Sequence, residues 1–72
     1  MIYFKLTDEK NKGMILRAEG TTVESYRKER GWVRDGILIR YTFPESDTFG
    51  MFEEISEEEA LKVIKMKNYK AL

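Results

Sequence analysis

The stretch FEEISEEEALKVI, residues 52–64, carries the strongest fold signal in the chain. Ser56 and Glu59 form the S-x-x-E capping box that begins many α-helices. Residues 51–55, before the cap, alternate in polarity as a short strand does. The apolar residues after the cap fall on one arc of a helical wheel, namely Ala60, Leu61, Val63 and Ile64. The stretch therefore predicts a strand followed by a C-terminal helix, ending near Asn68, whose apolar arc faces a sheet.

The acidic run inside this stretch is explained by the helix rather than by a metal site. Glu57, Glu58 and Glu59 are about 100° apart on a helix, so their carboxylates diverge, whereas a cation needs carboxylates that converge. Acids in a first helical turn also complement the helix dipole. Four acids are not explained by capping and form a candidate acidic surface, namely Glu45, Asp47, Glu53 and Glu54. We expect neither a metal nor any other cofactor.

The residues before this stretch predict an antiparallel meander. Four short apolar segments are separated by polar turns that contain glycine, namely IYFKL at 2–6, MILRA at 14–18, TVESY at 22–26 and WV at 32–33. Residues 37–43 suit either a strand or a short helical turn capped by Asp35, and Pro44 ends either element. The predicted fold class is α+β, a small antiparallel β-meander sheet of about four to five short strands packed by one C-terminal α-helix. Residues 1–72 form a single domain.

Composition narrows the classes of function. The 72 residues include no cysteine and no histidine, which excludes disulfides and thiolate zinc sites and removes the usual general base near neutral pH. No nucleophile motif is visible, and a domain of this size has little room for a substrate pocket, so we expect no enzyme. No apolar run reaches the ~20 residues of a membrane span, and the N-terminus lacks the pattern of a signal peptide. We therefore expect a cytoplasmic protein without membrane contact.

The formal net charge of zero hides charge that is segregated along the chain. The stretch YRKERGWVR at 26–34 interleaves bases with aromatic residues, a combination that contacts phosphates and stacks on bases. This candidate partner or nucleic-acid surface comprises Tyr26, Arg27, Lys28, Arg30, Trp32 and Arg34. The alternative is a charged turn beside a core tryptophan, since a small sheet usually buries its only Trp. On the first two predicted strands, Tyr3 and Ile15 lie on the face opposite to Phe4 and Leu16 and make that face partly apolar. We expect Tyr3 and Ile15 on the exposed surface too.

Two motifs resemble those of small uncharacterised proteins of Firmicutes and their phages or mobile elements. The first is a W-V-x-D stretch, matched by Trp32, Val33 and Asp35. The second is an I-S-E-E-E-A helix start, matched at residues 55–60 and preceded by Phe52. The resemblance implies a phage or mobile-element setting, and it implies no activity and no site residues.

These observations support two hypotheses for the function. The first is a small non-enzymatic protein-interaction module, which acts on a partner protein or associates with itself as a homodimer. The second is a nucleic-acid-binding accessory protein that uses the basic-aromatic stretch 26–34. A modest core and segregated charge favour the first hypothesis.

Overall fold

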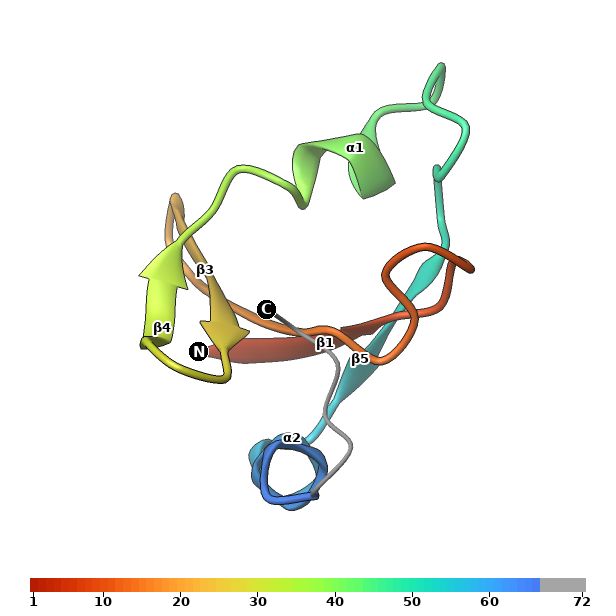
Figure 1. Ribbon diagram of the computed structural model, residues 1–72. Helices are drawn as coiled ribbons and strands as arrows, with labels where there is room; N and C mark the ends of the chain where they lie inside the picture. The colour runs from red at the N-terminus through yellow and green to blue at the C-terminus, as the bar shows by residue number, and fades with distance from the viewer. Residues whose placement is uncertain (67–72) are drawn as a thin grey trace.

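The computed structural model describes residues 1–66 and shows a five-stranded antiparallel sheet with helices on both sides (Figure 1). The strand order is β4-β3-β2-β1-β5. The elements are β1 (Ile2–Leu6), β2 (Ile15–Glu19), β3 (Thr22–Arg27), β4 (Gly31–Arg34), α1 (Ile39–Thr42), β5 (Phe52–Ile55) and α2 (Glu57–Ile64). The predicted α+β class, with an antiparallel meander and one main C-terminal helix, is confirmed.

Cross-strand pairing shows which residues share a face of the sheet. Tyr3 pairs with Arg17 and Ile55, and Arg17 pairs with Glu24, which pairs in turn with Arg34. These side chains lie on one face, which we call the α2 face because α2 contacts β1 and β2 there. Alternate residues lie on the opposite face, the α1 face, among them Phe4, Leu6, Leu16 and Ser25.

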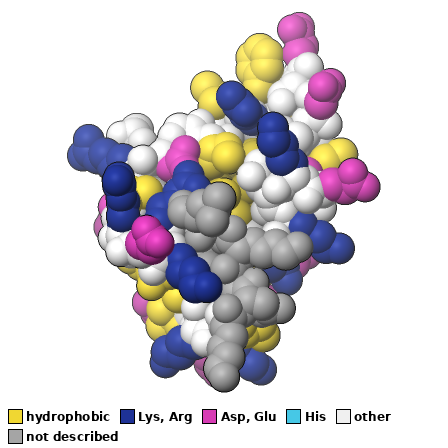
Figure 2. All heavy atoms as spheres, viewed as in Figure 1, with side chains coloured by type: hydrophobic (Ala, Val, Ile, Leu, Met, Phe, Trp, Pro, Cys, Tyr) yellow, Lys and Arg dark blue, Asp and Glu magenta, His cyan; other side chains and the backbone are white. Residues whose placement is uncertain are grey.

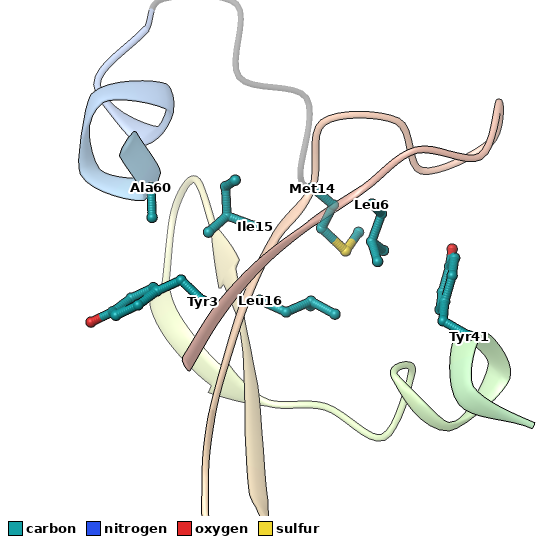
Figure 3. Close-up of a cluster of buried hydrophobic side chains, with 7 residues drawn as sticks. All are labelled: Tyr3, Leu6, Met14, Ile15, Leu16, Tyr41 and Ala60. Atoms are coloured by element: carbon teal, nitrogen blue, oxygen red, sulfur yellow. The ribbon is translucent and has the colours of Figure 1, made fainter. Parts of the chain in front are cut away.

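The core is divided between these two faces (Figure 3). On the α2 face, Ala60 of the helix is fully buried beside Ile15 and near Tyr3. On the α1 face, the ring of Tyr41 is 1% exposed and points toward Leu6. The expectation that Tyr3 and Ile15 lie on the exposed surface is therefore wrong, because α2 covers the face that carries them.

Helix α2 begins where the capping box predicts. The Ser56 hydroxyl oxygen accepts a hydrogen bond of 3.0 Å from the Glu59 amide, which satisfies one of the free donors of the first turn. Ala60 faces the sheet, and its small side chain lets the helix approach closely. Leu61 is 42% exposed, so its predicted place on the buried arc is wrong. The predicted helix end near Asn68 lies outside the described residues.

Within the ambiguous residues 37–43, Ile39–Thr42 form the short helix α1, and none of these residues lies in a strand. Asp35 does not cap α1 directly, because the N-cap is Leu38 and has no side-chain cap. Instead, an Asp35 carboxylate oxygen accepts a hydrogen bond from the Ile37 amide at 3.0 Å, which shapes the turn that leads into the helix.

A glycine allows the tight turn between β2 and β3. Glu19 pairs with Thr22, so only two residues form the turn between them. Gly20 takes a φ of 60°, a conformation that an L side chain rarely adopts, and the following residue has a negative φ. This pattern fits a type II′ turn, whose twist matches that of the flanking strands. No helix within residues 1–66 is long and apolar enough to cross a membrane.

Candidate functional site

Trp32, at the centre of the basic-aromatic stretch, packs against the α2 face of the sheet. Its ring lies edge-on to Tyr26 at 5.3 Å and to Tyr3 at 6.0 Å between centroids. The Arg17 guanidinium lies 4.1 Å from the centroid of the Trp32 ring, and Glu24 holds Arg17 by an ion pair of 2.7 Å. Trp32 is therefore half-buried, and a cation already occupies the position in which a base would stack.

The bases of the stretch separate into one structural residue and three exposed ones. Arg27 donates a hydrogen bond of 2.6 Å to a carboxylate oxygen of Asp35. Lys28, Arg30 and Arg34 are exposed and form no ion pair within residues 1–66. Of the six predicted residues, only Lys28, Arg30 and Arg34 are therefore exposed, at the β3–β4 turn and along β4.

The Asp35 carboxylate accepts hydrogen bonds from three residues, whereas the sequence predicted only a possible helix cap. Besides Arg27 and the Ile37 amide, it accepts a hydrogen bond of 2.8 Å from the hydroxyl of Ser25, which is fully buried. Burial raises the pKa of Asp35, but the hydrogen bonds from Ser25, Ile37 and Arg27 outweigh it and hold the pKa below 3.8. Because the Ser25 hydroxyl is buried and committed to this carboxylate, it has no access to a substrate.

A second buried polar cluster joins α1 to the β1–β2 loop. The Tyr41 hydroxyl donates to Asp8 Oδ1 at 2.7 Å and accepts from Asn11 Nδ2 at 3.0 Å. Burial, reinforced by the hydrogen bond to Asp8, raises the pKa of Tyr41 above its usual value. Asp8 is 7% exposed, so the cluster satisfies a carboxylate that would otherwise be costly to bury. The network holds α1 against the β1–β2 loop, and no sequence motif indicated it.

The four candidate acids do not converge on one point. Glu53 forms a hydrogen-bonded ion pair of 3.1 Å with Lys5. The hydrogen bond to Glu53 is the largest cause that raises the pKa of Lys5 above its usual value. Glu54 points to the opposite face from Glu53, as alternation along β5 requires. Glu45 and Asp47 are exposed on the loop after α1. Within residues 1–66, no three acidic side chains gather as a metal ion would require.

One surface feature of the structure is apolar. Ile39 is 67% exposed, Phe43 53% and Phe49 51%, and we call these three residues the apolar tip. Figure 2 shows hydrophobic side chains at the upper end of the molecule, where Figure 1 places α1 and the loop that follows it. A hollow of about 270 Å³ lies between Ile39 and Phe43, with Arg40 and Ser46 completing its lining.

Hydrogen bonds hold the loop of the apolar tip in one conformation. Thr48 donates its hydroxyl to the Arg40 carbonyl at 2.8 Å, and the Gly50 amide donates to the Tyr41 carbonyl at 2.8 Å. Ile39 and Phe43 belong to residues 37–43, for which the sequence predicts a strand or a short helical turn, and the tip was not predicted. The available signal was the presence of Phe43 and Phe49 in a segment with turn residues, since connecting segments lie on the surface.

Comparison of the chain with protein-family models, with curated protein sequences and with solved structures finds no match. The exposed features of residues 1–66 include the apolar tip and the bases Lys28, Arg30 and Arg34 at the β3–β4 turn and along β4.

Proposed function

We propose that the protein is a non-enzymatic protein-interaction module that binds a partner protein through the apolar tip. The observation that supports this most directly is the exposure of Ile39, Phe43 and Phe49 on a loop that is held by its own hydrogen bonds. Large apolar side chains on a fixed scaffold bind with little loss of conformational entropy. Aromatic anchors of this kind commonly dominate the binding energy of an interface.

The charges around the tip define the chemistry of the partner. Glu45 and Asp47 are exposed on the same loop and form no ion pair within residues 1–66. A partner with an apolar pocket and basic residues at its rim would bury the tip and complement these acids. The proposal includes a cytoplasmic location, with the lack of cysteines as support, and a phage or mobile-element setting, with the motif resemblance as support.

A site-specific photo-crosslink tests the role of the tip. A benzophenone side chain at position 43 is expected to capture a partner protein in cells, whereas the same group at position 61 is not. Leu61 is a matched control, because it is also a large apolar residue, 42% exposed, but on α2. With the captured protein purified, Phe43→Ser is expected to weaken binding by about 30-fold, as for a hot-spot aromatic residue. Equal capture from both positions, or equal affinity of Phe43→Ser, would contradict the proposal.

Nucleic-acid binding is the second candidate, favoured by the exposure of Lys28, Arg30 and Arg34 along one edge of the sheet. We expect only weak, salt-sensitive binding of single-stranded DNA or RNA, because three bases release few counterions. Trp32 fluorescence is expected to be unchanged, since Arg17 covers its ring. Fluorescence anisotropy with a labelled oligonucleotide measures both effects. Tight binding that quenches Trp32 and is lost in Arg30→Ala would favour nucleic acid over a protein partner.

A further inference from the structure

The two outer strands of the sheet, β4 and β5, present free backbone groups (Figure 1). The Thr7 amide donates to the Met51 carbonyl, so by alternation Phe52 and Glu54 direct their backbone groups away from β1. The Asp35 amide donates to the Val23 carbonyl, so Trp32 and Arg34 direct theirs away from β3. Each edge spans four residues, and within residues 1–66 neither has a further strand beside it.

These edges carry opposite charge. The β4 edge and its turn present the exposed bases Lys28, Arg30 and Arg34, with a single acid, Glu29. The β5 edge presents the exposed acids Glu53 and Glu54, with Glu53 paired to Lys5, and Glu58 follows in the first turn of α2. The separation is a property of the fold, because the sheet places strands from distant parts of the chain at its two ends.

We propose that the protein associates with itself by pairing β4 of one copy with β5 of a second copy. Pairing of two β4 edges would oppose bases to bases, and pairing of two β5 edges would oppose acids to acids. Like charges placed directly opposite each other across strands destabilise a sheet. Only the unlike pairing satisfies the free backbone groups of both edges and brings opposite charges together.

The residues that face outward determine the geometry of this contact. In an antiparallel pair, residues whose backbone groups point toward the partner strand lie directly opposite each other. Arg34 therefore lies opposite Phe52 or Glu54 of the second copy. In either register the Arg34 guanidinium reaches the Glu54 carboxylate, as a direct or diagonal neighbour. All pairings within the sheet are antiparallel, and this one continues the pattern. Helix α2 contacts β1 and β2, and among residues 1–66 no further strand pairs with the outer side of β5.

The contact is heterologous, because it joins two different surfaces of the same chain. Each copy in such a pair keeps one free β4 edge or one free β5 edge, so association continues into short chains or a closed ring. The contact uses none of the residues of the apolar tip. It can therefore be tested apart from the proposed function.

Sedimentation velocity at increasing protein concentration tests the proposal. The chain is expected to form dimers and larger species in about 20 mM salt and to dissociate in about 500 mM salt, where charges are screened within a few ångströms. Arg34→Glu alone and Glu54→Lys alone are each expected to weaken association by about tenfold or more, since each creates a like-charge contact. Circular dichroism and thermal melting of each variant establish that it folds.

A charge exchange separates this contact from general electrostatic attraction. The variant that combines Arg34→Glu with Glu54→Lys recreates an unlike pair and is expected to recover self-association, as is an equimolar mixture of the two single variants. Phe43→Ser, in the apolar tip, is the matched control and is expected to leave self-association unchanged. A monomer at every concentration in low salt, or a double variant as weak as the single ones, would overturn the proposal.

Discussion

Replacing Tyr41 by alanine is expected to remove much of the stability of the protein. The ring is 1% exposed and packs with the buried residues of the α1 face, including Leu6 and Leu16. Truncation of a buried aromatic residue costs about 3–5 kcal/mol, while a 72-residue chain has a free energy of unfolding of roughly 4–11 kcal/mol at ~0.05–0.15 kcal/mol per residue. Urea unfolding followed by circular dichroism measures the loss.

The comparison with Tyr41→Phe separates packing from hydrogen bonding. Phenylalanine keeps the ring but removes the donor to Asp8 and the acceptor for Asn11. We expect a loss of about 1–3 kcal/mol, the usual consequence of leaving a buried polar group without its partner. If the free energy of unfolding of Tyr41→Ala lay within about 1 kcal/mol of that of the natural chain, Tyr41 would not be the residue that holds α1 on the sheet.

Removing the Asp35 carboxylate is expected to produce the second largest loss. Asp35→Ala deprives the buried Ser25 hydroxyl of its acceptor and breaks the ion pair with Arg27. The Asp35 and Arg27 side chains are 18% and 26% exposed, so solvent weakens the pair in part. We expect a loss of about 2–3 kcal/mol in the free energy of unfolding, in the range of hydrogen bonds to charged groups. Val33→Ala, in the adjacent strand, is a control for the packing contribution.

The pH dependence of stability provides an independent check on Asp35. Its pKa in the folded chain lies below 3.8, so its stabilising contribution is fully present above pH 3.8 and is lost as the pH falls through the lower, folded value. The natural chain is therefore expected to lose this contribution in acid. Asp35→Ala cannot lose it, so the difference in stability between the two chains should shrink below pH 3.8. A constant difference across this range would show that the carboxylate is not preferentially ionised in the fold.

The elements that depend on local chemistry were predictable from sequence. The Ser56 cap, the glycine turns and the alternating strands depend on residues close together in the chain, and the structure confirms each of them. The faces of the sheet were harder to assign. Tyr3 and Ile15 alternate with Phe4 and Leu16, and both sets are apolar, so periodicity alone could not show that helices cover both faces.

The candidate surfaces depended on contacts between distant residues. Tyr41 reaches Asp8 across 33 positions, and this contact places the tip loop above the sheet without any local motif. Trp32 is a residue type that stacks on bases, but the Arg17 guanidinium, from another strand, lies over its ring. The tip was missed because apolar residues in a turn-rich segment can be buried or exposed, and only the packing of the whole chain decides between them.

The strand order β4-β3-β2-β1-β5 has a consequence for synthesis on the ribosome. β1 to β4 follow one another within residues 2–34 and can pair as soon as residue 34 emerges. β5 pairs with the first strand, so the outer side of β1 stays open until residues 52–55 are translated. An uncovered edge in a nascent chain is a template for premature pairing with a neighbouring polypeptide. Between those two points of translation, the β1 edge is therefore open to pairing with another polypeptide.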